Sequence, residues 1–174
     1  MDQKKAVLSV LVENNPGVLS RVSGLFSRRG FNIDSLTVGE TQDPNISRIT
    51  ISVTADELIL EQIKKQVNKL VDVIKIIELP PERSVFREIA LIKVAYDKGS
   101  RAELIQLVYD VFRGKIIDTQ ENSLIIELTG DPSKIQGFLN LIEKEGVIKE
   151  FVRTGITALE RGSKQLDEYG KYEV

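Results

Sequence analysis

The sequence of 174 residues contains no cysteine, no histidine and no tryptophan. The first two absences exclude thiol nucleophiles, disulfide bonds, metal sites with Cys or His ligands, and imidazole as a general base. An enzyme of this composition would need a carboxylate pair, an activated lysine or a bound metal. The chain shows no phosphate-binding loop, no Asp/Glu cluster with metal-ligand spacing and no serine with an evident base. We therefore predict no catalytic residues, no metal site and no cofactor in this chain.

Long apolar runs and a strong excess of one charge are also missing. No run approaches the roughly eighteen apolar residues that span a bilayer, and the N-terminal MDQKK leads into a strand pattern without a secretory segment. We expect a cytoplasmic protein with no membrane partner. The formal net charge is -2, and no basic patch is visible beyond Arg28-Arg29, so we also expect no nucleic-acid partner.

The sequence does contain an ordered series of amphipathic segments. Its first half predicts strand, helix, strand, strand, helix and strand, over residues 5–13, 15–30, 31–42, 46–54, 56–70 and 73–79. Both helices have one apolar stripe, made of Val18, Val22, Leu25 and Phe26 in the first and of Ile59, Ile63, Val67 and Leu70 in the second. The second half repeats this order, with strands at 86–96, 115–121, 124–129 and 147–153, and helices over 100–113 and from 131 onward.

This repeat, at a spacing of about eighty residues, predicts an α+β protein of two tandem ferredoxin-like βαββαβ domains, each an antiparallel four-stranded sheet with helices on one face. We expect a first domain over residues 1–79, a diproline linker over 80–85 and a second domain over 86–156. Residues 157–174 are charged and show little apolar pattern, which predicts a loose or partner-dependent tail.

The segment between the first strand and the first helix has the residues expected for an anion site. Asn15 suits the helix N-cap, Pro16 suits the first helical position, and Gly17 lets a ligand approach the backbone. The free N–H groups of Gly17, Val18 and Leu19 would then favour a carboxylate or phosphate.

Two asparagines flank this helix. Asn14 and Asn32 have side-chain oxygens that could bind an ammonium group, one of them across a subunit boundary. Asparagine is also a common turn residue, so turn formation without a ligand is the alternative interpretation of both positions.

Among function classes, an RNA reader of this topology would have stacking aromatics on its central strands, and residues 46–54 contain none. A regulatory module that binds an amino acid fits the residues better. In the second domain the corresponding loop, residues 96–100, has an aspartate and no Pro-Gly pair. We therefore expect the second domain to bind no effector and to serve in dimer or partner contacts.

Several extended segments resemble a known family. They are LSVLVENNPGVLSRVSGLFSRRGFNIDSLTVGET, SRITISV and EQIKKQVNKLVDVIKI in the first half, and REIALIKV, VFRGKIID and VRTGITALERG in the second. The first domain resembles an ACT domain, an amino-acid-sensing module. The whole chain, except its two ends, resembles the small regulatory subunits of acetolactate (acetohydroxyacid) synthase.

This resemblance implies a protein of branched-chain amino-acid biosynthesis (valine, isoleucine and leucine) with no catalytic residues of its own. Such subunits bind and activate the catalytic (large) subunit, which holds thiamine diphosphate, magnesium and FAD, and they confer feedback inhibition by valine or a related amino acid. Effector sites in the family lie between two ACT domains of a homodimer. Their positions fall here on Asn14, Gly17, Val18 and Asn32.

The predicted effector site, from the residues and the resemblance together, consists of Asn14, Pro16, Gly17, Val18, Leu19, Asn32 and Ile33. The family often has another residue where Pro16 stands, but a helix start leaves that N–H unused, so we expect the site to survive. The alternative function is a free-standing amino-acid-sensing ACT protein that regulates another enzyme or a transcription factor.

Overall fold

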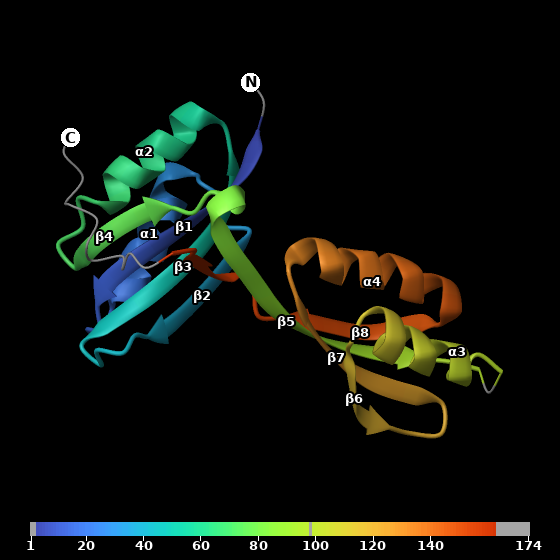
Figure 1. Cartoon of the computed structure of the whole chain (residues 1–174). Coiled ribbons are helices and arrows are strands. Elements are labelled where there is room, and N and C mark those ends of the chain that lie inside the picture. Colours follow the sequence, from blue (N-terminus) through green and yellow to red (C-terminus); the bar gives the residue numbers. More distant parts are fainter. Residues whose placement is uncertain (1–2, 98, 163–174) are drawn as a thin grey trace. The chain divides into compact units, whose positions relative to one another are not determined.

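The computed structural model describes residues 3–97 and 99–162 (Figure 1). The chain divides into two compact units. The described part of the first unit comprises residues 3–85 and 156–162, and that of the second comprises residues 86–97 and 99–155. Each unit contains its own sheet and its own hydrophobic core.

The first unit has the predicted βαββαβ order. Its elements are β1 (Lys4–Glu13), α1 (Val18–Arg29), β2 (Ser35–Glu40), β3 (Ile46–Ala55), α2 (Glu57–Val67) and β4 (Val73–Glu78). The sheet order is β2-β3-β1-β4 with antiparallel neighbours, so β1 is a central strand, as its long apolar run predicts. Both helices lie on the same face of this sheet (Figure 1).

The core of the first unit forms between that face and the two helices. The predicted stripe of α1 is confirmed, since Val18, Val22, Leu25 and Phe26 are all buried. Strand β3 contributes Ile49, Ile51 and Val53, which alternate with polar residues along the strand. Helix α1 ends at Gly30, whose φ of 68° is left-handed and accessible to glycine at little cost. Helix α2 begins at Asp56, whose side chain accepts a hydrogen bond from the Ile59 N–H, as predicted.

A short 3-10 helix, η1 (Pro81–Arg83), follows the two prolines and leads into the second half of the chain. The elements there are β5 (Ser84–Ala95), α3 (Arg101–Gln106), the π-helical η2 (Leu107–Val111), β6 (Lys115–Thr119), β7 (Ser123–Gly130), α4 (Pro132–Glu145) and β8 (Val147–Arg153). Their sheet has the order β6-β7-β5-β8, which matches the first unit strand for strand. The prediction of two antiparallel ferredoxin-like sheets with helices is confirmed.

Three local predictions need correction. Strand β2 begins at Ser35, not at residue 31, because Phe31 and Ile33 pack against the core instead of pairing with β3. The predicted single helix over 100–113 is a short α-helix that continues as a π-helical turn. Residues 157–160 form strand β9 (Thr157–Glu160), which pairs with β5, where the sequence predicts a loose tail.

That tail prediction fails because the segment around β9 has apolar residues at alternate positions. Ile156 and Ala158 are buried, and each such position removes apolar surface from water. Residues 163–174 of the predicted tail lie outside the described residues.

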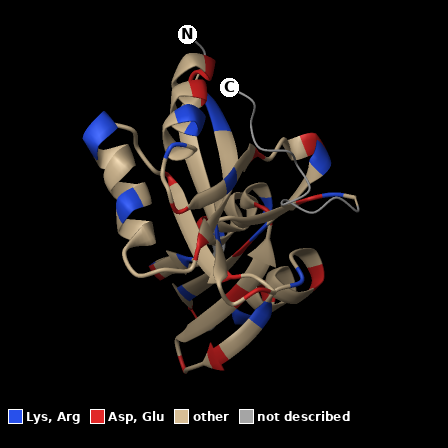
Figure 2. Ribbon diagram, turned by 90° about the vertical axis from the view of Figure 1, so that its left-hand side faces the viewer, with Lys and Arg blue, Asp and Glu red and all other residues tan. Residues whose placement is uncertain are grey.

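None of the described helices is long and apolar enough to cross a membrane. Figure 2 shows Lys and Arg interspersed with Asp and Glu along the ribbons that it presents. Some of these residues form ion pairs between segments that are distant in sequence, for example Lys4 with Glu57 at 2.6 Å and Lys93 with Glu150 at 2.6 Å.

Candidate functional site

The loop from Asn14 to Gly17 joins β1 to α1 and differs in detail from the predicted helix start. The N-cap is Gly17, not Asn15, and its φ of 85° places it in the left-handed region. A turn precedes the helix, because the Val18 N–H donates to Asn15 O at 3.3 Å. The first helical bond then runs from the Arg21 N–H to Gly17 O at 2.9 Å. Pro16 therefore lies in the turn and not in the first helical position.

This arrangement changes which backbone donors are available. The Val18 N–H is used by the turn, and the Val18 side chain is only 4% exposed within the core. Among the described residues, the N–H groups of Gly17 and Leu19 have no hydrogen-bond acceptor. The first turn of α1 contains no acidic residue. The helix start therefore favours an anion through both its free donors and its dipole.

Asn14 holds the loop to the β2–β3 hairpin. Its Nδ2 donates to Glu40 Oε1 at 3.2 Å and to Pro44 O at 2.9 Å, and its Oδ1 accepts from Ser47 Oγ at 3.0 Å. The Asn14 N–H also donates to Asn45 O at 2.7 Å. The Asn14 amide group thus links the loop to the hairpin, a structural role that needs no ligand. One lone pair of Oδ1 is left for a further donor.

Asn32 lies after the C-terminal end of α1 and is exposed. Its Nδ2 donates to Asp34 Oδ1 at 3.1 Å, while Asp34 Oδ2 accepts from Thr54 Oγ1 at 2.7 Å. Within the described part of the chain, Asn32 Oδ1 has no donor, and no hydrogen bond joins Asn32 to Asn14. The predicted set also contains aliphatic residues. Besides the buried Val18, Leu19 is 42% exposed and Ile33 packs against the core.

An ion pair beside the helix start was not predicted. Arg21 donates from Nε to Asp72 Oδ2 at 2.6 Å and from Nη2 to Asp72 Oδ1 at 2.8 Å. The hydrogen bond from Arg21 lowers the pKa of the Asp72 carboxyl, and the pKa of Arg21 is raised in return. Arg21 also lies close to the loop, because a Cβ on Gly17 would be 3.1 Å from Arg21 Nη1.

The sequence gives a partial signal for this pair. Arg21 is four residues after Gly17, which places it over the start of the same helix. Asp72 is 51 residues further along the chain, so its contribution depends on the tertiary fold. The pair adds a bidentate, charge-assisted contact that ties α1 to the turn before β4.

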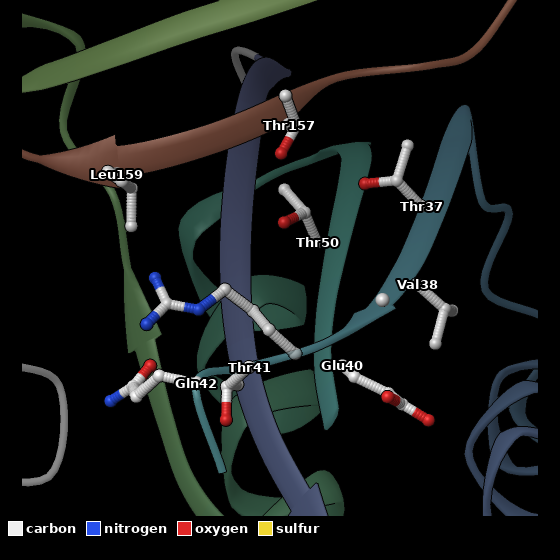
Figure 3. Close-up of a pocket in the computed structure, with 10 residues that line it drawn as sticks. Thr37, Val38, Glu40, Thr41, Gln42, Thr50, Thr157 and Leu159 are labelled. Carbon is white, nitrogen blue, oxygen red and sulfur yellow. The ribbon is translucent and has the colours of Figure 1, made fainter. Parts of the chain in front are cut away.

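A cavity of about 330 Å³ lies between β2, β3 and β9, all in the first unit. Figure 3 shows Thr157 of β9 beside Thr50 of β3 and Thr37 of β2, with Leu159 farther along β9. Thr37 Oγ1 donates to Ile156 O at 2.8 Å, which holds the start of β9 against β2. None of the seven predicted site residues lines this cavity, so it is distinct from the start of α1.

Metal ligands are not gathered anywhere in residues 3–97 and 99–162. No group of three or more His, Cys, Asp or Glu side chains in these ranges could hold a metal ion.

Comparison with known families gives two matches that together span most of the chain. Residues 8–75 match the family model described as an AHAS small subunit-like ACT domain. Residues 87–162 match the model described as the small subunit of acetolactate synthase.

Individual relatives agree with these models. A probable acetolactate synthase small subunit of Methanothermobacter thermautotrophicus is 49% identical over 167 residues, which cover 95% of this chain and 98% of that protein. The acetolactate synthase small subunit of Mycobacterium bovis is 51% identical over 164 residues, covering 94% and 96%. The crystal structure of the small subunit from Thermotoga maritima superposes with a TM-score of 0.83 at 46% identity, covering 92% of this chain and 99% of that chain.

Proposed function

The chain belongs to the family of acetolactate synthase small subunits, and from this premise we propose that it activates a catalytic subunit and makes it sensitive to valine or a related amino acid. Family membership supports a regulatory role. The observation that carries the effector proposal is the open start of α1, where the N–H groups of Gly17 and Leu19 lack acceptors among the described residues.

In the proposed complex the carboxylate of the amino acid accepts hydrogen bonds from Gly17 and Leu19. The ammonium group donates to the remaining lone pair of Asn14 Oδ1 and to Asn32 Oδ1. Leu19 and Ile33 supply apolar contacts for a branched side chain. Pro16 costs the site no donor, because it lies in the turn before the helix.

The two asparagines act from different copies of the chain in this proposal. Asn14 precedes α1 and Asn32 follows it, so the two lie near opposite ends of the helix. No hydrogen bond joins them among the described residues. Strand β2 is an edge strand of the first sheet, and Val38 on it is 47% exposed. An edge strand with free backbone groups favours pairing with a second copy, which supports a homodimer through the first units.

Catalysis belongs to the partner in this proposal. The catalytic subunit would supply thiamine diphosphate, magnesium and FAD, and this chain would supply none of them. The effector changes activity by a population shift. Valine can bias the catalytic subunit only by as much as it prefers one arrangement of the regulatory dimer over another.

A charge-only substitution at the helix start tests the site. Aspartate and asparagine have nearly the same shape and both tolerate a positive φ, so Gly17→Asp and Gly17→Asn impose a similar backbone cost. The added carboxylate of Gly17→Asp would repel the carboxylate of the effector. We expect both variants to activate the catalytic subunit and only Gly17→Asn to retain inhibition by valine, measured as acetolactate formation. Equal valine sensitivity of the two variants would contradict this location of the site.

Thermal unfolding of the isolated chain ranks the ligands. The panel contains valine, leucine, isoleucine, serine and glycine. A ligand at about a hundred times its dissociation constant stabilises the folded state by roughly 2.7 kcal/mol. Selective stabilisation by a branched-chain amino acid supports the proposal. If none of the five shifts the transition, even with the catalytic subunit present, the effector proposal is wrong.

A further inference from the structure

A second cavity, of about 460 Å³, lies in the second unit where β5 ends. Three segments line it, namely the residues that follow β5, the turn between β6 and β7, and the start of β8. Neither family match assigns a role to this cavity. The sequence predicts that the loop over residues 96–100, part of which lines the cavity, binds no effector and serves in dimer or partner contacts, so a ligand in this cavity would overturn that prediction. It is separate from the proposed valine site, because all of its lining residues belong to the second unit.

Backbone contacts build the walls of this cavity. The Tyr96 N–H donates to Asn122 O at 3.2 Å, and Tyr96 Oη donates to Gln120 O at 3.0 Å. Gly146 lets the turn before β8 approach β5 closely, because a Cβ at that position would lie 2.8 Å from Ala95 O. The cavity is therefore held by hydrogen bonds and by a glycine that no larger residue could replace without a shift of the backbone.

Three polar side chains around the cavity are not engaged. Among the described residues, the side chains of Asp97, Asn122 and Lys149 make no hydrogen bond or ion pair, although all three residues line the cavity. By contrast, the neighbouring Lys93 and Glu150 form an ion pair, with Lys93 Nζ 2.6 Å from Glu150 Oε2. The cavity thus presents an exposed carboxylate, amide and ammonium group that no other described side chain engages.

Lys149 has a special place in its strand. Lys93 pairs with Glu150 and Val94 pairs with Ile148, so Lys149 is the extra residue of a β-bulge in β8. A bulge redirects the side chain of its extra residue relative to the regular alternation of the strand, and bulges are frequent beside functional sites. The bulge gives a reason, independent of the cavity itself, for the position of this lysine.

We propose that this cavity binds a small zwitterion, an amino acid with a short apolar side chain. Asp97 accepts hydrogen bonds from the ammonium group, and Lys149 pairs with the carboxylate. Asn122 bonds to either charged group, and Val147 contacts the side chain. A ligand with both charges neutralises both protein groups, whereas a simple anion or cation leaves one of them facing a like charge. This inference does not rest on the proposed regulation by valine.

The test is a titration of the isotope-labelled full chain with L-alanine, followed by the amide NMR signals of Asn122, Val147 and Lys149. L-Alanine methyl ester, which lacks the carboxylate, and propionate, which lacks the ammonium group, are titrated in parallel. We expect alanine to shift these signals and each analogue to bind at least about tenfold more weakly, since losing a hydrogen bond to a charged group costs roughly ten- to a hundredfold in affinity.

Matched variants identify the two charged partners. Asp97→Asn and Lys149→Gln should each weaken alanine binding by roughly ten- to a hundredfold. Asp110→Asn and Lys144→Gln are the controls, because both residues are exposed in the second unit and neither lines the cavity. The controls should bind alanine as the unchanged chain does.

Three results would overturn the proposal. They are the absence of alanine-induced shifts at the three cavity amides, equal binding of alanine and either analogue, and full affinity in both Asp97→Asn and Lys149→Gln. Signals of Gly17 and Leu19 in the same spectra report on the first unit. Shifts confined to those two signals would support the valine site and reject the second cavity, so the two proposals can fail separately.

Discussion

The two units share one backbone plan at the corner where the central strand meets its first helix. In the first, the Asn14 N–H donates to Asn45 O at 2.7 Å; in the second, the Tyr96 N–H donates to Asn122 O at 3.2 Å. Each central strand also pairs with a strand that has a β-bulge. The extra residue is Ile74 in β4, which pairs with β1, and Lys149 in β8, which pairs with β5. The sheet topology therefore reproduces even these irregular details in two halves of different sequence.

The side chains at that corner differ. In the first unit Val73 of β4 pairs with Val12 of β1. Asp72, the residue before Val73, forms an ion pair with Arg21 that closes this corner. At the equivalent place in the second unit stands Val147, which is 59% exposed. The extra bulge residue is Ile74 in one unit and Lys149 in the other. At this corner the first unit has an ion pair beside an open helix start. The second unit has a cavity whose charged side chains have no partner among the described residues.

The largest expected effect tests how separate the two units are. The two hydrophobic cores have no residue in common, and Phe26 and Phe138 are each at most 1% exposed. Phe26→Ala and Phe138→Ala should each lower the free energy of unfolding of their own unit by about 3–5 kcal/mol. Amide hydrogen exchange, followed residue by residue, measures the protection of both units against unfolding in one experiment. Equal loss of protection in both units for either variant would show that they unfold together.

A smaller effect tests whether valine binding resides in the first unit alone. Asn32→Ala should weaken binding of valine by about 1.5–3 kcal/mol, because it removes a hydrogen bond to a charged group. Asn140→Ala, an exposed asparagine of α4, is the control and should leave the affinity unchanged. Calorimetric titration of both variants measures the difference. Unchanged affinity in Asn32→Ala would mean that Asn32 is only a turn residue.

The helix caps offer a matched pair with a smaller effect still. Asp56 accepts from the Ile59 N–H at 2.9 Å, and Asp131 accepts from the Lys134 N–H at 2.9 Å. Asp56→Ala and Asp131→Ala should each cost about 1 kcal/mol of unfolding free energy. Urea denaturation followed by signals from each unit measures both costs. A negligible cost at one cap would show that this helix is fixed by packing and not by its cap.

Local chemistry explains why so much of this fold was predictable. The Asp56 and Asp131 caps, the Gly30 stop and the stripe of α1 all depend on residues within a few positions of one another. The chain around β9 could not be predicted in the same way. Its burial comes from contacts far along the sequence, such as Thr37 Oγ1 to Ile156 O, which are 119 positions apart.

The candidate site shows the same division. The sequence predicts three free donors at the start of α1, of which Gly17 and Leu19 have no acceptor among the described residues. It misses the turn that uses the Val18 N–H and moves the N-cap from Asn15 to Gly17. The contacts that hold this loop and the start of α1 are the Asn14 hydrogen bond to Pro44 O and the Arg21–Asp72 pair, and both involve partners that are distant in sequence.

Acid titration gives the smallest and most selective comparison. Arg21 lowers the pKa of Asp72 in the first unit, while the Ser133 hydroxyl and the Lys134 N–H lower the pKa of Asp131 in the second, each from a usual value of 3.8. A carboxyl with a lowered pKa contributes stability that is complete above its unfolded value and is lost as the pH falls through its folded value. Both units should therefore lose stability below about pH 4.

Salt should separate the two causes. Arg21 is 47% exposed, so raising the ionic strength from about 0.1 M to about 1 M should weaken its hold on Asp72, because the screening length shortens from roughly 10 Å to 3 Å. The hydrogen bonds to Asp131 are local and less sensitive to screening. NMR titration of the two carboxyl carbons should show the Asp72 pKa rising with salt more than the Asp131 pKa. Equal shifts would mean that Asp72 is held by hydrogen-bond geometry and not by the charge of Arg21, which would make the corners of the two units more alike than their residues indicate.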